Sequence, residues 1–551
     1  MSEWDHTVDL VAVGSGGGGL MAAIAGSDAG LSTLVVEKQP HVGGSTSMSG
    51  GVLWVPANPL MREEGVLDSV ENGMAYFDSV VGDVGACSTP AKREAYIRRG
   101  GEVIEDLRAK GVEFIRAEGY ADYYSSRKGG VDRGRSVECR PFDASQIPEY
   151  ADKMLPGIAS MIGMTVYTNE LRSIQYVNRS PRAFLVAARV GARTAMGKLR
   201  RKRLLTNGSA LIANLVKIAR DQQVPIWLET PVQELVVEAG RVVGVVVVKE
   251  GRPFRVRATR GVLLAAGGFS RNGEMRKKFS EHTQPADETY SVSNPGDTGE
   301  VLEQAIALGA KTDLLDEAWW LPSAIPQLAQ TTIGQGRQRP NTILVSDKGR
   351  RFVNEADSMV EVAQGMFAHS DGTAWLIHDD DYRKRYVNGK GRPGILPPNV
   401  VEEGFLKRAD TIEELAVQMG IDPTVLAGTV SAWNKGAVRG LDPEFHRGES
   451  TYNRCMGDPS RKVPNPAVGP ILAAPFYAAK IIPADVGTCG GVLTDEHARV
   501  LGEDDRPIPG LYATGNITAT VMGRAYPGPG ASIANTIVFG YAAAKHVAGA
   551  R

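Results

Sequence analysis

Four residues near the N-terminus have the types and the spacing needed to hold the phosphates and a ribose of a dinucleotide. Gly14, Gly16 and Gly19 form the pattern GxGxxG, and Glu37 follows at roughly the 20-residue distance expected of a ribose-binding carboxylate. The first glycine allows a tight bend, the second lets the backbone approach a pyrophosphate, and the third permits close helix packing. The helix that follows would favour an anion at its N-terminus. We therefore predict nucleotide binding here, rather than an ordinary glycine-rich turn.

Small residues recur where a flavin would have to be held along its whole length. One group follows Glu37 closely and consists of Gly44, Ser45, Thr46, Ser49 and Gly51. A second group lies farther along the chain and consists of Val232, Gly267, Gly515 and Asn516. Ser532 and Ile533 begin the last predicted helix, whose N-terminus can stabilise negative charge at N1 and O2 of a reduced flavin. These residues favour FAD over NAD, with ordinary loop glycines as the alternative interpretation.

The hydrophobic pattern supplies the strands and helices that must position these residues. An apolar strand over residues 8–13 precedes the glycine turn, a helical pattern follows it, and a second strand over residues 32–38 contains Glu37. Residues 232–266 indicate three strands that end at Gly267, and a strand over residues 510–516 leads into a final helix. The glycine turn therefore lies between a strand and a helix, as the dinucleotide motif requires.

The first and last segments share one chemistry, which indicates one domain interrupted by another. We predict an α/β fold of mixed α+β character: a glutathione-reductase-type, Rossmann-like FAD-binding domain interrupted by a smaller α+β catalytic domain. The FAD-binding domain is expected over residues 1–315, with a helical insertion at about 60–205, and again over 482–551. The catalytic domain is expected over 316–481, with the active site between the two.

The composition of the 551-residue chain argues against several classes of protein. Lys and Arg number 62 and Asp and Glu 63, so no general attraction to nucleic acid is expected. The chain starts without a secretory signal and contains no apolar run of about 18 to 20 residues. The four cysteines and eight histidines lack metal-ligand spacing. We expect a cytoplasmic protein without a bound metal, and the oligomeric state is left open.

Residues 179–203 combine nine basic side chains with apolar residues and predict a basic amphipathic helix. Such a helix can lie on an anionic membrane surface, which would suit a poorly soluble substrate. A solvated helix face is the more common explanation of this pattern. Peripheral membrane contact through this segment is therefore an open alternative.

Five segments carry a family resemblance: GGVLWVPAN at 50–58, DEAWW at 316–320, RRFVNE at 350–355, GTCGGVLTD at 487–495 and YPGPGASI at 526–533. Through them the chain resembles the fumarate reductase and 3-oxosteroid dehydrogenase flavoprotein superfamily along nearly its whole length, and the steroid branch in particular. Fumarate reductases usually place a histidine before the GGxxxD turn and use an arginine as proton donor. The corresponding stretch here is Asp485-Val486-Gly487-Thr488, which makes dicarboxylate reduction less favoured.

The resemblance implies α,β-desaturation of a cyclic ketone, 1,2-dehydrogenation of a 3-oxosteroid above all, with the electrons passing from FAD to an external acceptor such as a quinone. It assigns polarisation of the ketone to the hydroxyl of Tyr526 and the N–H of Gly530. No histidine occurs in Gly44-Ser45-Thr46, so FAD is expected to be bound without a covalent link.

The chain departs from the family at the residue that should act as base. The family places a tyrosine shortly after the RFVNE motif, and Met359 stands there instead. A second family tyrosine matches Tyr123, and we hypothesise that Tyr123 or its neighbour Tyr124 removes the proton. Tyr176 and Tyr120 are less favoured substitutes, and the aromatic residues could instead only line an apolar pocket.

Other functions stay open on the same residues. The missing tyrosine is compatible with a smaller ring such as cyclohexanone or an oxocyclohexane carboxylate. Trp54, Trp319 and Trp320 could line a pocket for either substrate or belong to the core. A fumarate-reductase-like alkene reductase would need convergent arginines and a histidine. A flavin-binding protein without catalysis is the alternative outside the enzymes.

Overall fold

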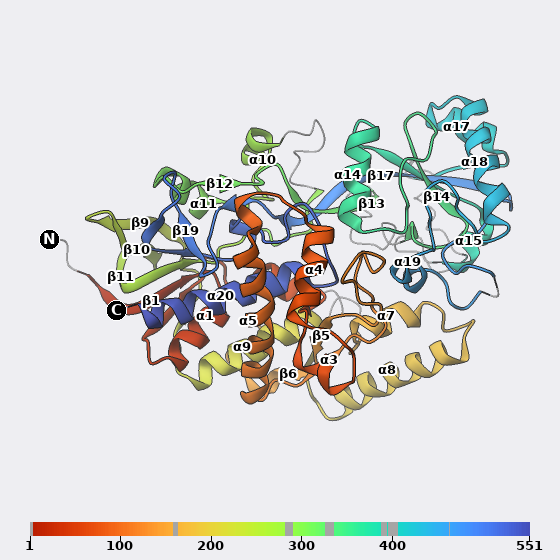
Figure 1. The fold of residues 1–551 in the computed structure, drawn as a ribbon. Coiled ribbons are helices and arrows are strands. Elements are labelled where there is room, and N and C mark those ends of the chain that lie inside the picture. Colours follow the sequence, from red (N-terminus) through yellow and green to blue (C-terminus); the bar gives the residue numbers. More distant parts are fainter. Residues whose placement is uncertain are drawn as a thin grey trace.

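The structure is a computed structural model that describes residues 4–157, 163–280, 290–324, 336–386, 394, 406–461 and 463–550. Two large sheets lie at opposite ends of the molecule, with helices packed between and around them (Figure 1). The sheet at the left of Figure 1 contains both the N-terminal strand and the strand before the last helix. The sheet at the right is formed by the middle of the chain.

The first sheet has eight strands in the order β19-β20-β11-β1-β2-β8, with β10 paired to β11 and β9 to β10. The central pairs β1–β11, β1–β2, β2–β8 and β11–β20 are parallel, and the outer pairs are antiparallel. Its strands are β1 His6–Val13, β2 Thr33–Val36, β8 Ile226–Trp227, β9 Val232–Glu238, β10 Arg241–Lys249, β11 Arg252–Leu264, β19 Arg499–Leu501 and β20 Pro507–Ala513. The predicted strands of the nucleotide-binding segments are therefore confirmed.

Strand β11 shows how the sequence pattern follows its two environments. Its first part pairs with β10 at the edge and alternates between exposed and buried side chains from Val256 to Thr259. Its last part, Val262 to Leu264, lies between β1 and β20 and is buried without alternation. Parallel strands covered on both faces require such continuous apolar runs. The strand therefore delivers Gly267 to the carboxyl edge of the sheet.

Helices α1 (Gly17–Asp28) and α20 (Ala531–Gly549) pack against each other beside this sheet. A Cβ atom on Gly540 would lie 2.3 Å from the carbonyl oxygen of Gly18, so the two helices approach more closely than larger residues would permit. Helix α9 (Asn207–Asp221) packs on the same α1. The N-terminus of the chain and its last helix are thus joined in one core.

The second sheet has five strands, in the order β13-β17-β15-β14, with β16 also paired to β17. They are β13 Ala318–Ala324, β14 Thr342–Ser346, β15 Ala374–His378, β16 Leu406–Ala409 and β17 Phe476–Thr488. Its helices are α14 Met359–His369, α15 Asp380–Arg385, α17 Ile412–Met419, α18 Pro423–Ala437 and α19 Thr451–Met456. The boundary predicted at residue 481 falls within β17, which runs back toward the first sheet. The domain limits themselves stay a prediction.

The segment predicted as a helical insertion contains strands as well as helices. The strands β5 Ser136–Cys139 and β4 Phe114–Arg116 pair with each other, and β5 also pairs with β3 Val52–Trp54, which precedes the segment. The helices of the segment are α3 Pro59–Glu63, α4 Val70–Val80, α5 Pro90–Ala109, α7 Thr168–Ile174 and α8 Pro181–Leu199, and α2 Gly44–Met48 precedes it. The remaining elements are β6 Phe142–Asp143, β7 Leu204–Leu205, β12 Thr312–Asp313, β18 Gly491–Val492, α10 Gly273–Phe279, α11 Glu300–Ala307, η1 Ala86–Ser88, η2 Ala144–Gln146 and η4 Gly515–Ile517.

Candidate active site

The glycine turn between β1 and α1 has a backbone that no larger residue could follow. Gly14 has φ of +107°, and a Cβ there would lie 2.3 Å from the carbonyl oxygen of Ala265. A Cβ on Gly19 would lie 1.9 Å from the carbonyl oxygen of Gly14. Gly16 is the N-cap of α1. A Cβ atom there would have space, because the nearest atom is Thr46 Oγ1 at 3.9 Å. The N-cap Gly16 has no side chain to cap α1, and the N-terminus of such a helix can bind an anion.

Glu37 stands just after β2 and is fastened to the same turn. Its carboxylate accepts hydrogen bonds from the Ser15 N–H at 2.9 Å and the Ser15 hydroxyl at 2.7 Å. It also accepts from the Gln39 N–H at 3.0 Å. A carboxylate held beside the N-terminus of α1 is placed to receive ribose hydroxyls next to a pyrophosphate.

Helix α2 brings the next group of small residues to the start of α1. Thr46 Oγ1 accepts a hydrogen bond from the Gly17 N–H at 3.3 Å. Ser45 donates to Asp297 at 3.0 Å and accepts from the Asn294 N–H at 2.9 Å. Gly44 has φ of +50°, and a Cβ atom there would lie 3.7 Å from the Gly16 Cα. These residues surround one narrow region of backbone.

The other predicted cofactor residues fall into two structural situations. Ser49 donates to the Thr46 carbonyl at 2.6 Å and accepts from the Gly51 N–H at 3.1 Å, which fixes the end of α2. Gly51 is pressed against the backbone of Asn207, where a Cβ would clash at 2.1 Å. Val232 begins β9 and pairs with Val247, at a partly exposed place on the first sheet.

The C-terminal part closes this region from the other side. Gly267, with φ of +78°, lies against the Asp297 carboxyl group, whose pKa is raised to about 7 by burial. Gly515 has φ of +82°, and Asn516 Oδ1 accepts from the Trp319 indole N–H at 3.1 Å. Ser532 and Ile533 lie in the first turn of α20. The helix N-termini and glycines left bare fit a dinucleotide cofactor such as FAD.

An aromatic cluster lies beside the N-terminus of α20. The ring of Tyr526 packs edge-on against Trp319 with centroids 5.2 Å apart, and it stacks on Tyr123 at 5.6 Å. Tyr123 also contacts Tyr452 at 4.6 Å and Tyr120 at 6.3 Å. The cluster thus draws on four separate parts of the chain and both large sheet regions.

Backbone hydrogen bonds hold the loop at 526–530 against the tract that carries Tyr123. The carbonyl oxygen of Pro527 accepts from the Tyr123 N–H at 3.0 Å and from the Tyr76 hydroxyl at 2.7 Å. The Ser136 hydroxyl donates to the Pro529 carbonyl at 2.7 Å. Gly530 follows with φ of +93°, and its missing Cβ lets it lie against Val52. Tyr526 and the N–H of Gly530 are therefore parts of one rigid loop.

Buried charges fix the tract before Tyr123 as well. Asp122 is fully buried, accepts from the Trp54 indole at 2.8 Å, and pairs with the guanidinium of Arg135. Arg135 pairs in turn with Asp68 at 2.7 Å. Trp54 is 0% exposed and packs on Tyr76 rather than lining an open pocket, so it belongs to the core.

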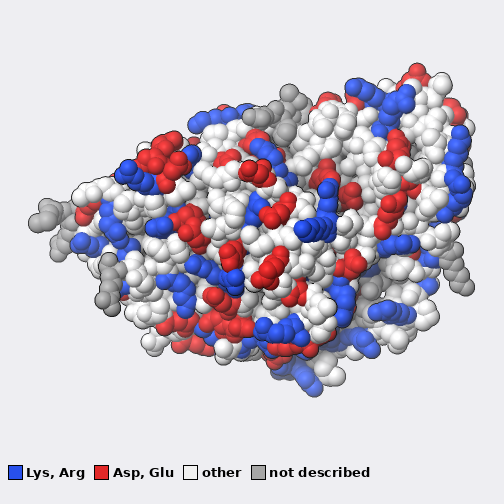
Figure 2. Space-filling model, viewed as in Figure 1, with Lys and Arg blue, Asp and Glu red and all other residues white. Residues whose placement is uncertain are grey.

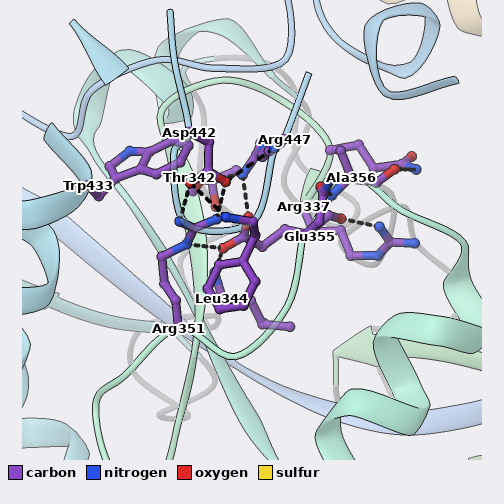
Figure 3. Close-up of polar contacts among 12 residues, drawn as sticks. Arg337, Thr342, Leu344, Arg351, Glu355, Ala356, Trp433, Asp442 and Arg447 are labelled. Atoms are coloured by element: carbon purple, nitrogen blue, oxygen red, sulfur yellow. Dashed lines mark hydrogen bonds and ion pairs between the residues drawn. The ribbon is translucent and has the colours of Figure 1, made fainter. Parts of the chain in front are cut away.

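A second charge network sets the segment that leads to Met359. Arg351 binds Glu355 at 2.8 Å and Asp442 at 2.8 Å, and Arg447 binds the other oxygen of Glu355 at 3.1 Å. Figure 3 shows these groups converging on the Glu355 carboxylate, with Arg337 bound to the carbonyl of the same residue. All are buried. The RRFVNE motif is thus a rigid platform for the start of α14.

Met359 is the first residue of α14, is partly buried, and packs against the core cluster that contains Tyr123 and Tyr526. Tyr124 lies near the same helix, where burial raises the pKa of its hydroxyl and the Glu361 carboxylate raises it further. Burial in turn raises the pKa of Glu361 to about 7. Acidic neighbours oppose a phenolate, so this environment disfavours Tyr124 as the base.

Tyr176 lies elsewhere. Its hydroxyl donates to the Gly457 carbonyl at 3.1 Å, and it packs in a separate cluster with Tyr382 and Tyr386. Burial raises its pKa to about 12. Among the tyrosines proposed as base, Tyr123 stacks directly on the Tyr526 ring, and Tyr120 packs beside Tyr123.

Sequence reasoning missed Tyr452, Tyr76, Arg135 and Arg172. Tyr452 belongs to a short helix far from the other motifs, and only the tertiary contact with Tyr123 reveals it. Arg135 had a usable signal, because an arginine beside the tract GYADYYSS needs a partner if that tract is buried. Among the residues described, no group of three His, Cys, Asp or Glu side chains could hold a metal ion.

Comparisons with known proteins place this site in a family. The model of an FAD binding domain matches residues 9–533. A 3-oxosteroid 1-dehydrogenase of Mycolicibacterium smegmatis is 38% identical, over 98% of this chain and 97% of its own. A 4-oxocyclohex-2-ene-1-carboxylate 5-dehydrogenase of Sinomonas cyclohexanicum is 34% identical, over 99% of this chain and 95% of its own.

The crystal structure of a 3-ketosteroid Δ1-dehydrogenase from Sterolibacterium denitrificans, in complex with 1,4-androstadiene-3,17-dione, superposes with a TM-score of 0.91. It is 34% identical and covers 99% of this chain and 100% of its own. The chain is thus a flavoprotein of the FAD-dependent oxidoreductases that act on CH–CH groups. It belongs to the superfamily of 3-oxosteroid dehydrogenases and fumarate reductases, within its 3-oxosteroid dehydrogenase branch.

Proposed function

We propose that this protein introduces a 1,2 double bond into a 3-oxosteroid. The observation that carries the proposal is the loop at Tyr526–Gly530, held at the N-terminus of α20 beside Trp319 and Tyr123. A phenol hydroxyl and a backbone N–H in a water-poor aromatic site are suited to polarise a ketone. The similarity to the two steroid dehydrogenases extends along the whole chain and supports a steroid as substrate.

The Tyr526 hydroxyl donates to the ketone oxygen, together with the N–H of Gly530. The oxygens of Tyr526 and Ser532 lie 3.1 Å apart, so the serine fixes the direction of the phenol. Burial raises the pKa of Tyr526, while hydrogen bonds from Ser532 lower it. The phenol therefore stays protonated and available as a donor near neutral pH.

Tyr123 removes the proton next to the ketone, in the role that Met359 cannot fill. Its ring stacks on that of Tyr526 with centroids 5.6 Å apart, so the two hydroxyl-bearing rings are direct neighbours. Burial raises the pKa of Tyr123 well above its ordinary value, and Tyr120, Tyr452 and Tyr526 raise it further, so Tyr123 needs a partner that takes its phenol proton.

FAD, when bound, accepts the hydride from the carbon next to the deprotonated one. Gly14, Gly16 and Gly19 would hold its pyrophosphate and Glu37 its ribose. The first turn of α20 would stabilise negative charge on the flavin ring. We expect the electrons to leave to an external acceptor such as a quinone, and acid precipitation to release all the flavin because no covalent link is formed.

Turnover of a steroid labelled with deuterium at C1 and C2 tests the function. The holoenzyme would be incubated with a saturated or Δ4 3-oxosteroid and an artificial electron acceptor, and the product examined by mass spectrometry. Loss of one label from each of C1 and C2 is expected. Retention of all label, with the acceptor left oxidised, would contradict the proposal.

A small cyclic ketone is the second candidate, because the relative from Sinomonas cyclohexanicum acts, by its name, on a 4-oxocyclohexene carboxylate and is 34% identical. Loss of the tyrosine at 359 would be a specificity change in that case. The same labelled-substrate experiment with 4-oxocyclohexanecarboxylate separates the two.

Contact with an anionic membrane surface is part of the proposal, through α8. Four large apolar side chains are exposed on α8, one pair near its start and one near its end: Phe184 at 60%, Leu185 at 58%, Met196 at 47% and Leu199 at 80% exposed. Exposed basic side chains lie on the same helix, and Figure 2 shows basic side chains along the lower right edge of the molecule, where Figure 1 places α8. A lipid-soluble substrate would reach the enzyme there.

Vesicles of mixed phosphatidylcholine and phosphatidylglycerol provide the test. Co-sedimentation of the holoenzyme is expected, and the double change Phe184→Ser and Leu199→Ser should abolish it. Leu67→Ser is the control, since Leu67 is 93% exposed at a different place. Equal sedimentation of all three proteins would contradict membrane contact through α8. In the described residues no helix is long and apolar enough to span a bilayer.

A further inference from the structure

One neighbour of Tyr123 lies directly beneath an arginine. The guanidinium carbon of Arg172, on α7, is 4.1 Å from the centroid of the Tyr120 ring. The rings of Tyr120 and Tyr123 are neighbours, with centroids 6.3 Å apart. Contacts therefore run from the Arg172 guanidinium to Tyr120, from Tyr120 to Tyr123, and from Tyr123 to Tyr526.

Among the residues that the structure describes, no carboxylate forms an ion pair with Arg172. Its Nη2 donates to the Asn169 side-chain oxygen at 2.8 Å, and its Nη1 faces the sulfur atoms of Cys455 at 3.6 Å and Met456 at 3.9 Å. Its Nε is buried and has no partner within the part of the chain that the structure describes. A weakly solvated cation over an aromatic ring strongly favours negative charge on that ring.

We propose that Arg172 and Tyr120 are positioning residues that make Tyr123 a base, in compensation for the methionine at position 359. The inference rests on the proposed function of the same site. The reactive form is the one in which Tyr120 has lost its proton to solvent, and Arg172 supplies the positive charge that stabilises this form. When Tyr123 takes the α-proton of the ketone, the C–H bond breaks and its electron pair stays on carbon. The phenol proton of Tyr123 passes to the Tyr120 oxygen, and the electron pair forms the new double bond as hydride leaves to FAD.

Several titratable groups face Tyr120, and their effects have different signs. Burial raises the pKa of Tyr120 above its ordinary value, and Cys455 and Glu138 raise it further, whereas Arg172 and Tyr123 oppose the rise. Burial raises the pKa of the Glu138 carboxyl group to about 7, so that group carries little negative charge below neutral pH. The groups that face Tyr120 are Arg172 from α7, Glu138 from β5, Cys455 and Tyr452 from α19, and Tyr123 and Tyr526 from the cluster.

The chain offers a matched pair of variants for the test. Arg172→Met removes the charge with little loss of length, and Arg172→Lys keeps it. Arg193→Met is the control, because the Arg193 guanidinium lies 4.6 Å from the Tyr167 ring on the neighbouring helix, outside the aromatic cluster. Anaerobic flavin reduction by a 3-oxosteroid would be followed by stopped flow between about pH 6 and pH 10, with steroid affinity measured separately.

Loss of Arg172 should raise the pKa of Tyr120, so the rate should fall about tenfold at neutral pH and recover at a pH about one unit higher. Arg172→Lys should restore part of the rate, and Arg193→Met should behave as the unchanged enzyme. Tyr120→Phe should remove the pH dependence, and adding Arg172→Met to it should cause no further loss. A pH profile unchanged by Arg172→Met, or lowered equally at every pH, would overturn the inference.

A readout without substrate separates this inference from the function itself. The ultraviolet absorbance of phenolate, titrated in the holoenzyme, should include the ionisation of Tyr120. That ionisation should move to higher pH in Arg172→Met and disappear in Tyr120→Phe. If it does not move, the inference fails even where the steroid is oxidised. If it moves and no ketone reduces the flavin, only the proposed function fails.

Discussion

The glycine turn at 14–19 and the aromatic cluster around Tyr526 are built in opposite ways. The turn is a continuous stretch whose backbone conformations are fixed by glycines, between a strand and a helix that adjoin it. The cluster gathers side chains from residues 120–123, 319, 452 and 526, which meet only in the folded chain. Cofactor binding is therefore encoded locally, whereas the chemistry depends on how the two sheet regions pack.

The first test of this contrast adds one methyl group to the glycine turn. Gly19→Ala would place a Cβ 1.9 Å from the Gly14 carbonyl oxygen, and we expect complete loss of FAD binding. Flavin absorbance per protein after purification measures it. Gly101→Ala is the control, because nothing lies within 4 Å of a Cβ there. Full flavin content in Gly19→Ala would contradict local encoding.

The second test changes the buried charge network around Glu355, which supports the packing of the aromatic cluster. Glu355→Gln leaves Arg351 and Arg447 without their shared carboxylate and should cost about 3–5 kcal/mol in the free energy of unfolding. Urea unfolding measures the loss. Glu444→Gln is the control, since Glu444 is exposed and lies 3.6 Å from Arg351. A Glu355→Gln protein as stable as the control would contradict this role of the network.

The same network predicts a pH dependence. Burial alone would raise the pKa of Glu355, but Arg351 and Arg447 hold it below its ordinary value. A lowered folded-state pKa contributes stability that is complete above the unfolded value of about 4.3 and is lost as the pH falls through the folded value. The unchanged protein should therefore lose more stability on acidification than Glu355→Gln does.

The third test removes the Tyr526 hydroxyl, the hydrogen-bond donor of the aromatic cluster. Tyr526→Phe should slow flavin reduction by a ketone about 100-fold, because a hydrogen bond made in the transition state is lost, while flavin content stays the same. Tyr541→Phe, on the same C-terminal segment but remote from the cluster, is the control. Rates within twofold of the control would remove Tyr526 from the mechanism.

The smallest expected effect comes from restoring the tyrosine of the family. Met359→Tyr should raise the rate of flavin reduction by a 3-oxosteroid, by about tenfold or less, since Tyr123 already acts as base. Met359→Leu keeps the volume and should have no effect. A loss of rate in Met359→Tyr, with the Leu variant unchanged, would indicate that position 359 selects a different substrate.

These differences follow what a sequence can and cannot specify. Periodicity and glycine spacing predicted β1, α1, β2 and the hairpin strands, because each depends on neighbours in the chain. The resemblance to the superfamily supplied Tyr526, Gly530 and Met359. Arg172 and Tyr452 could not be found that way. A single arginine on a short helix belongs to no sequence motif. Its role can be inferred only from its contact with the Tyr120 ring in the folded chain.

The domain limit predicted at residue 481 stays a prediction, and strand β17, Phe476–Thr488, extends across it. The long strand joins the second sheet to the turn at Gly487 and thereby brings Trp319 to Tyr526.

Anaerobic mixing of the purified holoenzyme with androst-4-ene-3,17-dione and, separately, with cyclohexanone tests the central claim most directly. We predict that the steroid bleaches the oxidised flavin band within the time of a turnover and that cyclohexanone does so far more slowly. Bleaching by cyclohexanone alone would move the assignment to small cyclic ketones. Failure of both ketones to reduce the flavin would contradict desaturation at this site.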